Sequence, residues 1–186
     1  MTPSFLKTAC VVLSALLLWG CVSQAPQEPR YTSSFISVSE PGFVLAPGDR
    51  FAWFAPAEVI SDGEHSLGEK TIEHLRERFE QRMTEQGFQM VGSTDSADYW
   101  ISAVIILGDA VSEQELVQRY DIAPALSNLA NYEAGTLVMR LVSPLGRRTQ
   151  WRGAMELFTD PSLKAEERQR RVDYAVDTFA RHLSPK

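Results

Sequence analysis

Histidine, cysteine and carboxylate side chains do most enzyme chemistry, so their spacing is the first indication of function. The three histidines, His65, His74 and His182, lie far apart, and none belongs to an H-E-x-x-H or other metal-binding spacing. The sequence has no G-x-S-x-G nucleophile motif and no glycine-rich loop that would hold phosphate. We therefore expect no catalytic residues, no metal site and no cofactor.

The carboxylates that lie close together in sequence have simpler roles than acid–base catalysis. Asp95 and Asp98 flank a turn-forming stretch, and Glu113 and Glu115 begin an expected short helix, in which Ser112 and Glu115 form a capping box. General acid–base chemistry needs two carboxyl groups held in one cleft with separated pKa values. Turn formation and capping account for these residues, so we interpret the protein as a non-enzyme.

Cys21 is placed for a chemical modification. It follows an uncharged apolar run, residues 9–19, with Lys7 before the run and Gly20 after it. This pattern is typical of a secretory signal over residues 1–20. A short transmembrane anchor is the alternative, although a spanning helix needs about 20 apolar residues. The segment Leu17-Leu18-Trp19-Gly20-Cys21 resembles the lipobox of bacterial lipoproteins, which implies cleavage before Cys21 and lipidation of its sulfur.

The same resemblance implies a location. Val22 and Ser23 follow the cysteine, whereas an aspartate there is the inner-membrane retention signal of well-studied lipoproteins. We therefore expect a lipid anchor in the outer membrane, with the protein on the periplasmic side. Cys10 lies inside the signal, so the mature chain would keep a single cysteine and form no internal disulfide.

The charge balance excludes some partners. The net charge is −6, and it becomes −7 once residues 1–20, with Lys7 and no acid, are removed. An acidic domain attracts neither nucleic acid nor an anionic lipid surface. The expected partners are the membrane, through the lipid anchor, and another envelope protein.

The rest of the chain divides at a change of composition. Residues 21–47 are rich in Ser, Pro and Gln, which predicts a lipidated, flexible tether with one extended stretch near Phe35–Val38. Residues 48–184 are long enough for a single domain with one core.

Apolar periodicity predicts two main helices. Ile72, Leu75, Phe79 and Met83 recur at helical spacing over residues 69–86, and Gly87 follows as a stop. A second helix begins at Pro161. Its core stripe contains Val172, Ala175, Val176, Phe179 and Leu183.

Five apolar stretches predict strands, at residues 51–55, 88–91, 99–107, 135–142 and 149–158, and the last two form a hairpin. The segment around Asp62-Gly63 is expected to be a loop. The resulting order, strand–helix–four strands–helix, predicts an α+β domain. It would have a mostly antiparallel sheet of about five strands and two main helices on one face.

Residues 109–132 are the least regular part of the domain. Their second apolar stretch makes Ile122, Leu126 and Leu129 candidates for a partner surface; a lid packed on the domain's own core is the alternative. Arg152, within Trp151-Arg152-Gly153, is a further candidate because a guanidinium binds carboxylates. The simpler explanation of this motif has Trp151 in the core, Gly153 at a close contact and Arg152 paired with a neighbouring acid.

Several short motifs, taken in order, resemble a bacterial lipoprotein family known as domain of unknown function 4136. They cover most of residues 49–183 and follow the lipobox-like Cys21. They are Phe51-Ala52-Trp53, Gly87-Phe88, Ser96-Ala97-Asp98-Tyr99, Tyr132-Glu133-Ala134-Gly135-Thr136-Leu137 and Trp151-Arg152-Gly153. The family has no established reaction, so the resemblance implies a fold and a location.

These observations predict an outer-membrane lipoprotein with a non-enzymatic periplasmic domain that binds a protein partner or supports an envelope complex. The main alternative is a domain that binds a small ligand or a lipid, and an enzyme is the third possibility. A cavity lined by Trp53, Trp100 or Trp151 would favour the small-ligand alternative. An exposed apolar patch over residues 122–129 would favour a protein partner.

Overall fold

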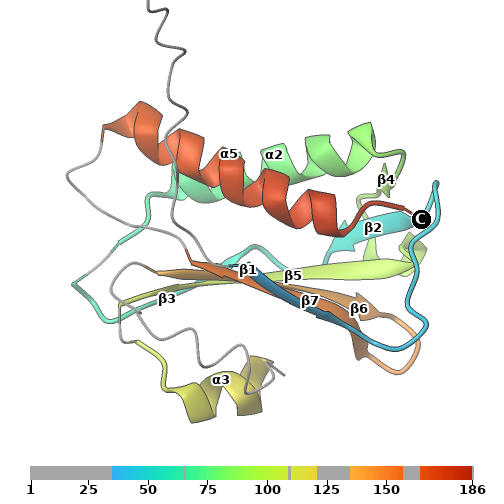
Figure 1. The fold of residues 1–186 in the computed structure, drawn as a ribbon, viewed down its shortest axis with the longest axis horizontal. Coiled ribbons are helices and arrows are strands. Elements are labelled where there is room, and N and C mark those ends of the chain that lie inside the picture. The colour runs from blue at the N-terminus through green and yellow to red at the C-terminus, as the bar shows by residue number, and fades with distance from the viewer. Residues whose placement is uncertain (1–34, 65, 109, 121–134, 157–163, 186) are drawn as a thin grey trace, which may run out of the picture. The chain divides into compact units, whose positions relative to one another are not determined.

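The computed structural model describes residues 35–64, 66–108, 110–120, 135–156 and 164–185. These residues belong to one compact unit. In this unit a sheet carries two long helices on one face and a short helix on the other (Figure 1). The folded part therefore begins upstream of residue 48, because strand β1, Phe35–Ser39, already pairs within the sheet.

Helix α2, Glu69–Glu85, begins at the predicted residue and ends one residue before the predicted 86; Leu75, Phe79 and Met83 of the predicted stripe are buried and Ile72 is half-buried. Two backbone bonds close its C-terminus: Gly87 donates to the Thr84 carbonyl at 3.0 Å and Phe88 donates to the Met83 carbonyl at 3.1 Å. This Schellman arrangement needs a left-handed residue after the helix, and Gly87 has φ +89°. The glycine is therefore the reason that the helix stops there.

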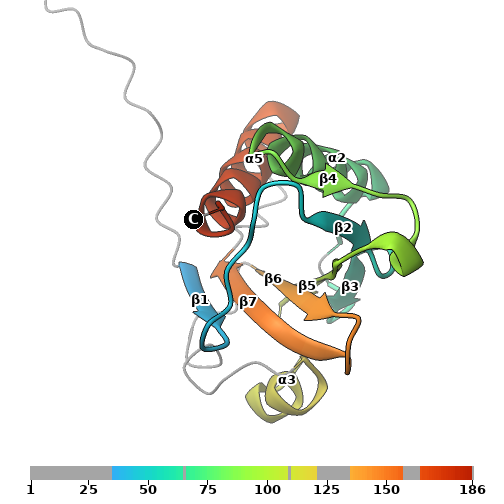
Figure 2. The ribbon, with the colours of Figure 1, turned by 90° about the vertical axis from the view of Figure 1, so that its right-hand side faces the viewer.

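Helix α5, Ala165–His182, lies alongside α2 (Figure 2), and all five residues of the predicted stripe are buried, the last of them, Leu183, at the C-cap. Ion pairs between half-buried side chains join the two helices. Arg82 donates two hydrogen bonds to the carboxylate of Asp177, at 2.6 and 2.8 Å, and His74 Nε2 lies 2.8 Å from Asp173 Oδ1. The prediction of a start at Pro161 falls on residues 157–163, outside the described part.

The sheet has seven strands and is mixed, so the predicted five-strand, mostly antiparallel sheet is wrong. The strand order is β1-β7-β6-β5-β2-β4, and β3 also pairs with β5. Besides β1, the strands are β2, Arg50–Trp53; β3, Glu58–Ser61; β4, Gln89–Met90; β5, Tyr99–Leu107; β6, Thr136–Ser143; and β7, Arg148–Glu156.

The parallel pairs follow from the position of α2 in the chain. β2 and β3 both pair parallel to β5, and β2 also pairs parallel to β4. Parallel neighbours need a crossover connection, usually a helix, and α2 supplies it between β3 and β4. β5, β6, β7 and β1 are joined by antiparallel pairs, in agreement with the predicted hairpin.

The segment that follows Pro56 and contains Asp62-Gly63 was predicted to be a loop, but its residues Glu58–Ser61 form β3. Its pairing with Val104 to Leu107 of β5 gives those residues a regular conformation. β2 pairs with Tyr99 to Ile101 of the same strand. β2 and β3 are thus successive pieces along one edge of β5, and residues 54–57 interrupt them opposite Ser102 and Ala103.

The two faces of β5 have different surroundings. Ile101, Ile105 and Leu107 are fully buried in the main core beneath α2 and α5. Val104 and Ile106 point to the opposite face, where they form a second cluster that includes Val111. Helix α3, Glu113–Tyr120, lies on this second side (Figures 1 and 2). The helices are therefore not confined to one face, although the two long ones are.

One half of the predicted Ser112–Glu115 capping box is observed, and the predicted turn near Asp95 is also present. Ser112 Oγ accepts a hydrogen bond from the Glu115 amide at 3.3 Å, at the start of α3. Ser93 Oγ accepts one from the Asp95 amide at 3.2 Å, beside a 3₁₀ turn at Thr94–Ser96.

Candidate functional site

Most of the residues predicted to form functional sites lie outside the described residues. This holds for Cys21, the lipidation candidate, and for Ile122, Leu126 and Leu129, the partner-surface candidates. Arg152 is described: it is half-buried on β7, where its register neighbours are Arg140 on β6 and Val38 on β1.

The residues that flank Arg152 belong to the core. Trp151 is 4% exposed, and its ring meets Phe179 of α5 edge-on, with centroids 6.1 Å apart. Gly153 lies against both rings, so close that a Cβ there would be 2.6 Å from Trp151 Cη2. The core explanation is therefore confirmed for the tryptophan and the glycine.

Asp98, one of the carboxylates weighed for acid–base chemistry, has a structural partner. Arg50 donates side-chain hydrogen bonds to both of its oxygens, at 2.8 and 3.1 Å, and the Arg50 amide donates a third at 2.9 Å. These bonds hold the pKa of the Asp98 carboxyl below its ordinary value. Asp98 thus fastens the start of β5 to β2.

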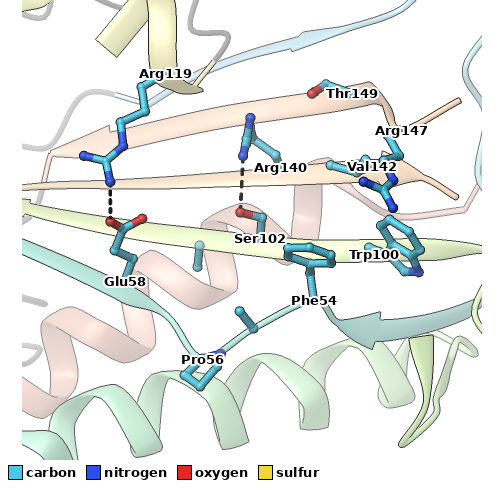
Figure 3. A pocket seen from close by; sticks show the side chains of 12 residues that line it. Phe54, Pro56, Glu58, Trp100, Ser102, Arg119, Arg140, Val142, Arg147 and Thr149 are labelled. Atoms are coloured by element: carbon cyan, nitrogen blue, oxygen red, sulfur yellow. Dashed lines mark hydrogen bonds and ion pairs between the residues drawn. The ribbon is translucent and has the colours of Figure 1, made fainter. Parts of the chain in front are cut away.

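A groove of about 390 Å³ opens on the face of the sheet opposite α2 and α5. Its floor is built by β5 and β6, and its sides come from the interruption between β2 and β3, from α3 and from the β6–β7 hairpin (Figure 3). The interruption follows from the sequence, since Pro56 cannot donate a ladder hydrogen bond. The lining residues are Phe54, Ala55, Pro56, Glu58, Trp100, Ser102, Ala103, Arg119, Arg140, Val142, Arg147 and Thr149.

Two aromatic rings form one wall of the groove. The rings of Phe54 and Trp100 lie side by side, with centroids 5.3 Å apart and planes inclined by 31° (Figure 3). Phe54 is 60% exposed, an unusual position for a phenyl ring. The indole N–H of Trp100 donates to the Thr94 carbonyl at 2.9 Å, so this N–H is held by the protein's own backbone.

Three guanidinium groups give the groove a positive character. Arg119 of α3 donates to Glu58 at 3.1 Å, and Arg140 of β6 donates to Ser102 Oγ at 3.5 Å (Figure 3). Arg147 lies at the hairpin turn, where it adopts φ +52° beside Gly146 at +78°. Among the lining residues, these three cations compare with one carboxylate, that of Glu58.

This arrangement suits binding better than reaction. Arginine stays protonated at all ordinary pH values, and Glu58 is paired with Arg119. Within the described ranges, no three His, Cys, Asp or Glu side chains are grouped so that they could hold a metal ion. The same part of the chain contains no helix long and apolar enough to cross a membrane.

Sequence reasoning missed the groove, although the sequence contains a sign of it. Ser102 and Arg140 are polar residues within otherwise apolar strands, and the register places them directly opposite each other. A polar residue that interrupts an apolar strand is the signal by which the sequence could have indicated the groove. Their pairing depends on the register between β5 and β6, which the sequence pattern does not specify.

The fold has counterparts among solved structures. A DUF4136 family protein from Bacteroides thetaiotaomicron superimposes with a TM-score of 0.59 and 14% sequence identity, over 83% of this chain and 98% of that chain. This chain has the DUF4136 fold. The PelC dodecamer from Paraburkholderia phytofirmans also matches, with a TM-score of 0.51 and 8% identity, over 83% of this chain and 99% of that chain.

No family model matches the sequence, and no curated protein matches it. At these identities the likeness to the DUF4136 protein and to PelC concerns the fold alone. It confirms the fold that the short motifs implied, including the sheet that carries Trp151-Arg152-Gly153.

Proposed function

We propose that the chain is an outer-membrane lipoprotein whose non-enzymatic periplasmic domain binds a protein partner through the groove between α3 and the β6–β7 hairpin. The observation that carries the proposal is the combination of an exposed aromatic wall with three arginines. Aromatic and arginine side chains dominate the binding energy of protein interfaces.

The lipid anchor adds a physical advantage to such a domain. Acylation of Cys21 would hold the domain beside membrane-bound partners and so raise its effective concentration there. Assembly into larger complexes is consistent with the fold, since PelC of similar fold is a dodecamer. The proposed role is accordingly that of a component in an envelope complex.

A small-ligand site is the second candidate, because Trp100 lines the groove. A volume of about 390 Å³ lies within the range of small-molecule sites, roughly 300–1,000 Å³. Such a ligand would occupy the same groove, so the two candidates differ in the occupant and not in the place.

Intact mass spectrometry of the protein purified from bacterial membranes tests the anchor. The expected mass begins at Cys21 and includes added acyl chains, whereas the Cys21→Ser protein should carry no lipid and leave the membrane fraction. An unmodified mass for the native chain, or a membrane-bound Cys21→Ser protein, would contradict the proposal.

Photo-crosslinking in living cells tests the binding face. A photoreactive residue in place of Phe54 should capture an envelope protein, while the same residue in place of Glu77, exposed on α2, should not. Equal capture at both positions would argue against the groove. If the photoreactive residue at position 54 captures no protein and instead displaces a small molecule bound in the groove, the small-ligand candidate would be favoured.

A further inference from the structure

We propose that the groove binds an acidic, extended segment of the partner, with a carboxylate on Arg140 and an apolar side chain two residues away on Phe54 and Trp100. This inference rests on the proposed function and adds the chemistry of the partner segment. Four features of the groove lead to it: length, register, charge and exposed apolar surface.

The groove has the length of a short extended peptide. Its lining runs along β5 from Trp100 to the level of Glu58, whose register partner is Val104. At about 3.3 Å per residue, four residues of strand span roughly 13 Å. An extended segment of about four residues fits this length.

The register of β5 and β6 fixes the spacing between the two contacts. Ser102 is opposite Arg140, and Trp100 is opposite Val142, so the guanidinium and the indole stand two residues apart on one face. Side chains of an extended peptide that face the same way also alternate by two residues. A partner acid and a partner apolar residue at positions i and i+2 would meet both contacts at once.

The charge of the groove is opposite to that of the molecule. The chain carries a net charge of −6, yet the groove holds three arginines against Glu58. The bond from Arg140 to Ser102, at 3.5 Å, is long for a hydrogen bond. A guanidinium has five N–H donors, so Arg140 can keep its intramolecular contacts and still donate charge-assisted bonds to a partner carboxylate, and such bonds are about twice as strong as neutral ones.

The aromatic wall supplies the apolar contact. Phe54 exposes 60% of its surface, and the Trp100 N–H is already bonded, so the rings offer apolar surface instead of a hydrogen bond. Covering this surface would contribute binding energy that depends little on salt. The acidic molecule as a whole repels long polyanions, which favours a short acidic segment of a protein over nucleic acid.

Selection from a random peptide library tests the inference directly. The probe is a displayed library of about eight-residue peptides, twice the length that the groove accommodates, presented to the full chain purified from membranes. Enriched sequences should carry Asp or Glu two residues from an aromatic or leucine residue. Enrichment of basic or purely apolar sequences, or of none, would overturn the inference.

Binding of the most enriched peptide is then measured by fluorescence anisotropy. Changing its acid to the matching amide should weaken binding by roughly tenfold, as should Arg140→Gln in the protein. Arg140→Lys should bind with intermediate strength, because lysine keeps the charge but loses the planar pair of donors. Arg170→Gln on α5 is the matched control and should bind like the native chain, as its guanidinium is exposed on the far face.

The outcomes separate this inference from the proposed function. An amide peptide that binds as well as the acidic one overturns the acidic chemistry. Crosslinking at position 54 that persists in the Arg140→Gln variant would also overturn the acidic chemistry, but it would leave the proposed function intact. Loss of the Cys21 anchor with intact peptide selectivity would instead overturn the lipoprotein role. Unchanged melting temperatures of the variants confirm that each one folds.

Discussion

Gly153 lies against the indole of Trp151 so closely that the two residues exclude any additional atom. A Cβ at position 153 would be 2.6 Å from Trp151 Cη2 and 3.0 Å from Phe179 Cε1. We therefore predict that Gly153→Ala lowers the free energy of unfolding by about 1–3 kcal/mol, through overpacking between β7 and α5. Urea denaturation measures this change.

Gly92→Ala is the control for that substitution, because a Cβ at position 92 would meet nothing within 4 Å. It should leave the free energy of unfolding within about 0.5 kcal/mol of the native value. Equal stability of the two variants would mean that α5 packs more loosely on the sheet than the structure indicates.

Trp151 should be a major source of stability. Its side chain is 4% exposed in the main core, so Trp151→Ala should cost roughly 3–5 kcal/mol in thermal or urea unfolding. Phe54→Ala removes another aromatic ring, but one that is 60% exposed, and it should cost less than about 1 kcal/mol. A near-neutral Trp151→Ala would contradict the observed packing against Phe179.

The Arg82–Asp177 pair should make stability depend on pH. Hydrogen bonds from Arg82 hold the pKa of the Asp177 carboxyl below its ordinary value, despite partial burial. The stabilisation is therefore complete above the unfolded-state pKa of about 3.9 and is lost as the pH falls through the lower folded-state value. Asp177→Asn should cost about 1 kcal/mol at pH 7.

Urea unfolding of the native chain and the Asp177→Asn variant at several pH values measures this dependence. The difference between them should shrink steadily below about pH 4. Glu77→Gln, an exposed change on α2, should give no comparable narrowing. A difference that stays constant down to pH 2 would show that the ion pair contributes nothing.

The end of α2 should depend on the backbone conformation of Gly87. Its φ of +89° is readily available only to glycine, so Gly87→Ala should lower the free energy of unfolding by about 1 kcal/mol. Gly87→Asn should lose less, since asparagine tolerates the left-handed region better than alanine. Circular dichroism during heating compares the two, and a reversed order would contradict a conformational cause.

Local patterns predicted a large part of this fold. The periods of α2 and α5 identified their buried residues, and the apolar run of β5 was predicted with its observed bounds. Both helices follow local rules, because an apolar stripe and a terminal glycine are read within one segment. The wrong sheet type has a non-local cause: strand direction and partner depend on the path of α2 across the sheet.

The candidate site likewise combines local features that the sequence predicts with non-local features that it does not. Proline chemistry predicted that the strand ends before Pro56, and β2 ends at Trp53, two residues short of the predicted 51–55. Nothing local indicated that β3 would resume along the same edge of β5. The groove exists only because these two strands, α3 and the hairpin meet around Ser102. Arg152 was singled out from its motif, whereas its register neighbour Arg140 is the arginine that lines the groove.

The alternation along β5 has a consequence for how this fold changes over time. Ile101 and Ile105 belong to the core, while Trp100 and Ser102, one residue away, line the groove. Substitutions at the groove positions therefore alter recognition without repacking the interior beneath the long helices. One scaffold can in this way acquire new specificities while its architecture persists; the architecture itself is kept in proteins that are only 14% and 8% identical to this chain.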